Sequence, residues 1–346
     1  MRKFLVITFL AGALTAAGQT AETNQKNTLG YFDHLDLSVT LGTSGVGFDL
    51  ATPLGNYVQL RAGYEFMPNI HFPVDFPIEV GGEPAEKYDA SGKRVESRFD
   101  RLAKNLKELT GYDVDNHVEM IGKPTMNNFK LLVDVFPFKN NKHWHFTAGF
   151  YLGPSQFARA DNAIEAMPSL MAVDMYNHMY DCVENFWETG EPIMSITIGG
   201  TPYAIPDLDP KQVQTVLNNG RMGFQLGQYK EDMYSPEGLL IHKKGDSYVV
   251  EPGEDHQVHV YAKSSAFKPY LGFGYGGRLC KKRDDWKVSF DAGALFWGAP
   301  DLYTHDGTNL TKDIENIKGK VGDYVDFIGG LKVYPSISVR FTKTLF

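Results

Sequence analysis

Charged side chains recur in segments of this chain that are otherwise apolar or small. Five carboxylates and six cations share this setting. They are Asp36, Asp49, Glu65, Asp134 and Asp291, with Arg61, Lys130, Lys268, Lys287, Lys332 and Arg340. A buried charge is costly unless it is paired, so nearly equal numbers of both signs suit a shared interior. We predict that these residues form a nearly neutral ionic network.

Other candidate chemistry is weaker. His143 and His145 could chelate a metal from one strand face, but we expect one in a turn and the other in an interior. Ser289 and His145 could belong to a Ser/His/acid hydrolase set, although no spacing in the sequence brings them together. Asp207 and Asp209 lack the spacing of a calcium loop, and no phosphate loop or nucleotide fingerprint occurs. The sequence therefore predicts no catalytic residue, no metal and no cofactor.

The charged residues lie on segments with a period of two, which is typical of β-strands. In 144–152, aromatic and aliphatic residues at even positions alternate with His, Thr, Gly and Tyr at odd positions. Similar segments cover about 57–66, 129–138, 267–276, 286–296 and 331–341. In 35–51 the apolar residues occupy odd positions before Gly42–Gly45 and even positions after it. This change favours a tight hairpin and hence eight strands in total. One long strand with a bulge is the alternative.

The bulky face of these strands is expected to point outward. Eight strands enclose an interior only just wide enough for side chains, and the Leu, Val, Phe and Trp face is too voluminous for it. An outward apolar face on every strand requires lipid, and strands of about 9–12 residues suit a tilted crossing. We therefore predict an all-β transmembrane barrel of eight antiparallel strands. Its aromatic girdle would comprise Tyr57, Phe66, Trp144, Trp286, Phe296 and Phe341.

Connection lengths and the N-terminus indicate the expected cellular location. Short polar turns at 53–56, 139–142 and 281–285 alternate with long connections at about 68–127, 154–265 and 298–327. Bacterial outer-membrane barrels have short periplasmic turns and long external loops. Residues 1–18 combine a cationic start, an apolar run and small residues before Gln19, which is typical of a cleavable signal peptide. We expect residues 19–346 to form an integral barrel of the cell outer membrane.

Four stretches carry a resemblance to a known family. They are Leu41–Tyr64, Leu131–Phe138, Lys268–Gly276 and Val333–Phe341, which together cover the strands. They resemble small OmpW/OmpA-like outer-membrane barrels of Gram-negative bacteria. The resemblance implies a mostly non-enzymatic barrel that is structural, a narrow porin-like channel or a binding surface. It also implies a terminal aromatic residue preceded by alternating apolar residues, a pattern that Phe341 fits, so 342–346 is expected to be a short extension.

The external insertions at about 68–127 and 154–265 are predicted to form a small α+β cap. A helix is expected over 95–109 with Gly111 as its stop, a Met-rich helix over 168–187, and a third from Asp209 to Gly220. We interpret the Met-rich face as ordinary core, with an adaptable binding surface as the alternative. Ile196–Tyr203 and Ile241–Tyr248 are expected to be hairpins. Recognition is expected in this cap because a rigid scaffold positions its loops.

The two cysteines provide a check on this topology. Cys182 would lie in the external cap, whereas Cys280 precedes a periplasmic turn. The two would be separated by roughly the bilayer thickness of about 30 Å, far beyond the reach of a disulfide. We therefore predict no intramolecular bridge between them.

Composition limits the classes of partner. The 346 residues include 34 Lys and Arg against 42 Asp and Glu, a net charge of −8 that falls to −10 without Arg2 and Lys3. Nucleic acid is therefore not an expected partner. The expected partners are outer-membrane lipid, lipopolysaccharide and the barrel-assembly machinery, together with an unidentified external ligand or partner. We interpret the chain as a non-enzymatic structural or binding barrel. The alternatives are a narrow channel for small solutes, apolar ones included, and a lipid-modifying enzyme.

Overall fold

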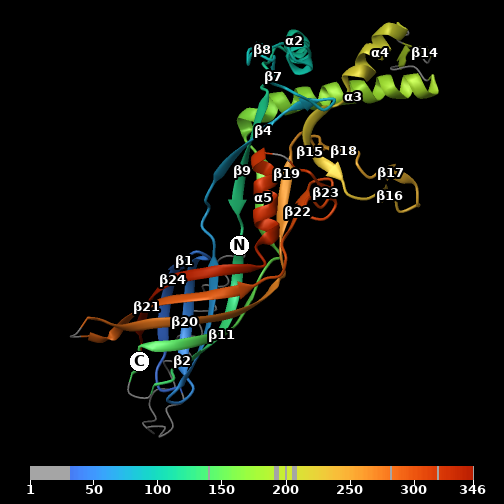
Figure 1. Cartoon of the computed structure of the whole chain (residues 1–346). Helices are drawn as coiled ribbons and strands as arrows, with labels where there is room; N and C mark the ends of the chain where they lie inside the picture. Colours follow the sequence, from blue (N-terminus) through green and yellow to red (C-terminus); the bar gives the residue numbers. More distant parts are fainter. Residues whose placement is uncertain are drawn as a thin grey trace.

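The computed structural model describes residues 32–138, 141–190, 195–198, 201–204, 209–280, 283–317 and 319–345. The expected signal peptide lies outside the described residues. Eight antiparallel strands close into a barrel in the order β1-β2-β3-β10-β11-β20-β21-β24, and β24 pairs with β1 (Figure 1). They are β1 (Asp36–Gly42), β2 (Gly45–Pro53), β3 (Val58–Phe66), β10 (Asn127–Val135), β11 (Trp144–Leu152), β20 (Phe267–Cys280), β21 (Arg283–Phe296) and β24 (Val333–Thr344). The predicted eight-stranded barrel is confirmed.

A tight turn joins the first two strands. Gly42 pairs with Gly45, and the register runs without a break to Asp36 opposite Ala51. Gly45 has a φ of +119°, and a Cβ atom at this position would overlap the carbonyl oxygen of Phe66. Glycine is required there because other residues rarely adopt that backbone conformation. The hairpin is thus confirmed and the bulged single strand is excluded.

The barrel is apolar outside and polar inside. Exposed Leu, Val, Phe, Tyr and Trp side chains occur on all eight strands or at their ends. Every predicted girdle residue faces outward: Tyr57, Trp144, Phe296 and Phe341 are exposed, and Phe66 and Trp286 are half-buried. An apolar surface of this extent around a closed barrel suits hydrocarbon rather than water.

The long connections carry all the other elements. The first contains β4 (Phe72–Pro77), β5 (Glu79–Val80), β6 (Glu83–Pro84), β7 (Lys87–Tyr88), β8 (Arg94–Val95), α2 (Arg98–Thr110) and β9 (His117–Pro124). The second contains β12 (Gln156–Asn162), η1 (Ile164–Ala166), α3 (Met167–Thr189), β13 (Ser195–Ile198), β14 (Thr201–Ala204), α4 (Pro210–Asn219), β15 (Met222–Tyr229), β16 (Met233–Tyr234), β17 (Leu240–His242), β18 (Ser247–Val250) and β19 (His259–Lys263). The third contains β22 (Asp301–Thr304), β23 (Ile314–Glu315) and α5 (Gly319–Gly330).

These elements form one cap beyond one end of the barrel (Figure 1). One sheet has the order β22-β19-β12-β9-β4, so all three connections contribute strands to it. A second sheet has the order β18-β15-β5-β6, with β23 paired to β15. A single hydrophobic core joins both sheets, α2, α3 and α5. The cap is therefore larger than predicted, because the third connection belongs to it as well.

The predicted helices are present. Ser97 caps α2 through a capping box with Asp100, and Gly111 ends the helix in the left-handed conformation. Asp209 caps α4, which ends at Gly220. Within the described ranges no helix is long and apolar enough to cross a membrane.

Three local predictions were wrong. Ile241–Tyr248 is not a hairpin, because β17 pairs with β16 whereas β18 pairs with β15. The Met-rich face of α3 is not core: Met171, Met175 and Met179 are all exposed. Residues 342–344 continue β24 rather than extending beyond it, because their threonines face polar groups inside the barrel.

Two further predictions agree with the structure. The hairpin expected over 196–203 is present as paired β13 and β14. Cys182 is free on α3 in the cap, while Cys280 ends β20 at the opposite end of the barrel. Their separation agrees with the predicted absence of a bridge.

Candidate functional site: the barrel lumen and the cap

The centre of the lumen is organised around a fully buried carboxylate. Asp134 on β10 accepts hydrogen bonds from Arg61 at 2.9 Å, from Thr147 at 2.6 Å and from Arg340 at 3.4 Å. Strand alternation places these side chains inside, since all four occupy the face opposite the exposed apolar residues. Two guanidinium groups therefore share one carboxylate at a place that water does not reach.

Asp291 extends this cluster across the lumen. It accepts from Arg340 Nε at 3.2 Å and from Ser289 Oγ at 3.0 Å, and its other oxygen is 2.6 Å from His145 Nε2. The structure thus brings together Ser289, His145 and an acid that the sequence left apart. Their order is not that of a hydrolase, because the serine donates to the carboxylate and not to the histidine. All three also face the lumen.

A second ionic cluster lies around Lys130. Its Nζ is 3.1 Å from Asp49 Oδ1 and 2.8 Å from Glu65 Oε2. Thr40 donates to Asp49 at 2.9 Å, and Ser44 donates to Glu65. One buried ammonium is therefore held between two buried carboxylates.

The remaining predicted lumen residues lie at the barrel ends. Asp36 is 3.5 Å from Lys287, whose side chain is 42% exposed, so this pair sits at an open mouth. At the cap end, buried Lys268 donates to Asn128 at 3.1 Å and to the carbonyl of Pro154 at 3.4 Å. Lys332 does not belong to the network: it is exposed and precedes β24, so its predicted role in the lumen is wrong.

An apolar layer that was not predicted from the sequence lies inside the barrel. Leu132, Tyr151, Tyr270 and Leu295 pack together on the inward face, and Tyr334 packs against them. Tyr151 and Tyr270 have ring centroids 5.5 Å apart. The alternation along each strand does place these residues on its inward face. Around Leu132 the alternation is hard to recognise, because both of its neighbours are apolar as well.

Glycines make room for this layer, and an aromatic chain joins it to the cap. A Cβ atom at Gly272 or Gly293 would overlap the hydroxyl of Tyr270. Tyr334 also packs against the cap core, and its ring centroid lies 4.9 Å from that of Trp297. The apolar layer in the lumen and the cap core are thus continuous.

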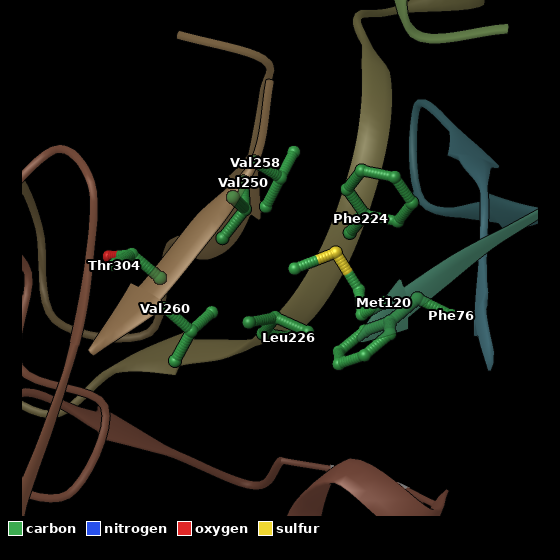
Figure 2. Close-up of a pocket in the computed structure, with 8 residues that line it drawn as sticks. All are labelled: Phe76, Met120, Phe224, Leu226, Val250, Val258, Val260 and Thr304. Carbon is green, nitrogen blue, oxygen red and sulfur yellow. The ribbon is translucent and has the colours of Figure 1, made fainter. Parts of the chain in front are cut away.

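A hollow lies between the two cap sheets (Figure 2). Its lining residues are Phe76, Met120, Phe224, Leu226, Val250, Val258, Val260 and Thr304. Thr304 Oγ1 is already hydrogen-bonded to Asp306 at 2.5 Å and lies 2.6 Å from the Tyr248 hydroxyl. The cavity volume is about 10 Å³, which leaves room for about one water molecule. The lining offers apolar contact and no unused polar group.

No metal centre is found in the part of the chain that the structure describes. No group of three or more His, Cys, Asp or Glu side chains there is arranged to hold an ion. His143 lies in an exposed turn with its Nδ1 2.6 Å from the Gly276 carbonyl, whereas His145 is in the lumen. The two histidines therefore lie apart, as expected.

Comparison with known proteins gives only distant matches. No family model matches the chain, and no curated protein sequence matches it. Acinetobacter baumannii CarO2 is 13% identical with a TM-score of 0.39, over 92% of this chain and 100% of that one. Acinetobacter baumannii CarO is 13% identical with a TM-score of 0.36, over 90% of this chain and 98% of that one. A major outer membrane protein from Thermus thermophilus is 10% identical with a TM-score of 0.25, also over 90% of this chain and 98% of that one. TM-scores this low do not establish a shared fold. The fold is therefore assigned from the strand pairing above, and the OmpW/OmpA-like resemblance stays a prediction.

Proposed function

We propose that this protein is an integral outer-membrane barrel with a closed lumen, which anchors an external cap that binds a ligand or partner. The filled lumen is the observation that carries the proposal. Asp134, Lys130 and Asp49 are at most 1% exposed, whereas charges lining a water-filled pore would be hydrated. The layer around Tyr270 adds an apolar seal between this network and the cap.

The outward surface supports the location. Exposed apolar side chains surround the barrel, and the predicted girdle aromatics are part of that surface. We infer that lipid and lipopolysaccharide contact this band and that the barrel-assembly machinery inserts it. Residues 1–18 supply the export signal in this proposal.

A non-enzymatic role fits the lumen chemistry. Ser289 and His145 each contact Asp291, and His145 lacks the bond to serine that would activate a nucleophile. A lipid substrate would have to reach them through the strands. If the protein modified lipid, deletion or overexpression would change the masses of lipid A species, and we expect no change.

Conductance tests the proposal directly. The purified mature chain in a planar bilayer is expected to give no steady current, while a general porin measured in the same bilayer conducts. A matched variant, Tyr270→Gly with Tyr151→Gly, removes both rings of the apolar layer and is expected to raise the current relative to the native chain. Regular current steps from the native chain, reduced when Arg340 is replaced, would overturn the closed-lumen proposal.

The cap is tested separately. A chain in which all three long connections are replaced by short turns is expected to remain resistant to unfolding in cold detergent but to lose any surface-binding phenotype. Removing only one connection is a poorer test, because all three connections contribute to one sheet. Retention of the phenotype by the cap-free barrel would place recognition elsewhere.

A further inference from the structure

Residues 251–258 connect β18 to β19 and run along the rim of the cap hollow. Val250 and Val258, at the two ends of this connection, both line the hollow (Figure 2). Inside the connection Gly253 and Gln257 close a turn, with Gly253 N donating to the Gln257 carbonyl at 2.8 Å. Val258 N donates to Asn162 Oδ1 at 3.0 Å, which fixes one end. The segment is thus a short flap with a fixed base.

His259 ties this flap to the sheet. Its Nδ1 lies 2.9 Å from Asp161 on β12, and its Nε2 lies 2.9 Å from Asp255 within the flap. A neutral imidazole carries a single N–H, so it can donate to only one of these carboxylates. Both contacts are hydrogen bonds only when the ring is protonated.

The charges around His259 favour the protonated ring. Partial burial opposes the charge, but the hydrogen bonds to Asp255 and Asp161 outweigh it, so the pKa of His259 lies above its ordinary value. Arg159 and Lys123 approach from β12 and β9, and both bind the other oxygen of Asp161. The ring of Tyr261 on β19 stacks on His259 with a centroid distance of 6.2 Å.

Glu251, the first residue of the flap, is also fixed, because Arg221 donates to its carboxylate at 2.5 and 2.6 Å. The other groups near the flap are bound outside it or exposed. Asp306, in the turn after β22, accepts from Tyr248 at 2.9 Å and from Thr304 at 2.5 Å. The neighbouring His305 is half-buried, and burial lowers its pKa, so it adds little positive charge. His256 forms a second link at 2.9 Å from Asp174 on α3, but both side chains are exposed, so this link contributes little.

We propose that residues 251–258 form a flap over the apolar hollow. Protonated His259 latches this flap shut, and the latch releases as the pH rises and His259 loses its proton. The sign follows from linkage: because the folded state favours protonated His259, the latch is complete below the ordinary pKa of about 6.5 and weakens as pH rises above it. Release loosens Asp255 and the middle of the flap, while Arg221 still holds Glu251 and Asn162 still holds Val258.

Amide hydrogen exchange on the full mature chain in detergent micelles tests the latch. Rates are measured at pH 5.5 and 8.5 and corrected for the intrinsic pH dependence of exchange. Protection of 251–258 is expected to fall about three- to tenfold at the higher pH, the factor for one partly exposed charge-assisted hydrogen bond. Helix α4, which contains no histidine, serves as the internal reference and is expected to change by less than about twofold.

Variants separate the latch from a general effect of pH. His259→Gln is expected to show low protection of the flap at both pH values, and Asp255→Asn is expected to lose most of the pH dependence. His256→Gln is the matched control and should keep it. Equal protection of the native flap at both pH values would overturn the proposal. So would an unchanged pH dependence in a folded His259→Gln protein, judged by its resistance to unfolding in cold detergent.

Discussion

Replacing Asp134 with leucine is expected to lower the free energy of unfolding by about 3–5 kcal/mol. The side chain is fully buried and accepts hydrogen bonds from Arg61, Arg340 and Thr147. Leucine fills a similar volume, so the expected loss is electrostatic rather than a packing defect. It arises because two buried guanidinium groups lose a shared counter-ion that water cannot replace.

The companion substitution identifies the cause. Arg61→Met combined with Asp134→Leu removes one charge of each sign and leaves Arg340 paired with Asp291 at 3.2 Å. The double variant is expected to recover most of the loss, because an apolar pair of similar size often replaces a buried ion pair without cost. Lys287→Met is the matched control at the open mouth, where about 0–1 kcal/mol is expected.

Urea titration of the refolded barrel in lipid vesicles, followed by tryptophan fluorescence, measures these differences. Reversibility must be shown for each variant, since only then is the free energy defined. A loss below about 1 kcal/mol for Asp134→Leu would mean that water reaches the guanidinium groups. That result would refute both the magnitude and the closed lumen.

Three other predictions concern separate parts of the molecule. Gly63→Ala is expected to cost about 1–3 kcal/mol in the same urea titration, because its methyl group would overlap the Asp49 carboxylate. Leu295→Ala should cost about 2–5 kcal/mol and increase the pore current, since it opens a hole in the apolar layer; an unchanged current would argue that the layer is not the seal. Ser97→Ala should cost α2 about 0.5–2 kcal/mol, seen as faster amide exchange confined to 98–110, whereas exchange that stays slow would show that packing alone holds the helix.

The barrel was predictable because the pattern that defines each strand lies within a few consecutive residues. Alternation along each strand decides which side chains face in, and that placed Asp134, Lys130 and Arg340 in the lumen without reference to any partner. Lys332 was misplaced because the strand begins one residue later, at Val333. The threonines at 342 and 344 were misjudged because they are polar, yet they hydrogen-bond Ser38 and Asp36 inside the barrel.

The cap was only partly predictable because its pairing is not local. Capping residues marked α2 and α4 well, since Ser97, Gly111 and Asp209 act within a few residues of themselves. Strand partners in the cap lie far apart in the chain, as when β5 pairs with β15, and the local pattern does not name them. The latch at His259 was out of reach for the same reason, because Asp161 comes from a different strand.

The shared cap sheet has a mechanical consequence. Each of the three long connections leaves the barrel from one strand and returns to another, so six strand ends support a single folded body. A pull on any point of that body is divided among six tethers, and no single ladder of backbone hydrogen bonds carries the whole load. A force applied to the cap would therefore be distributed over six of the eight barrel strands.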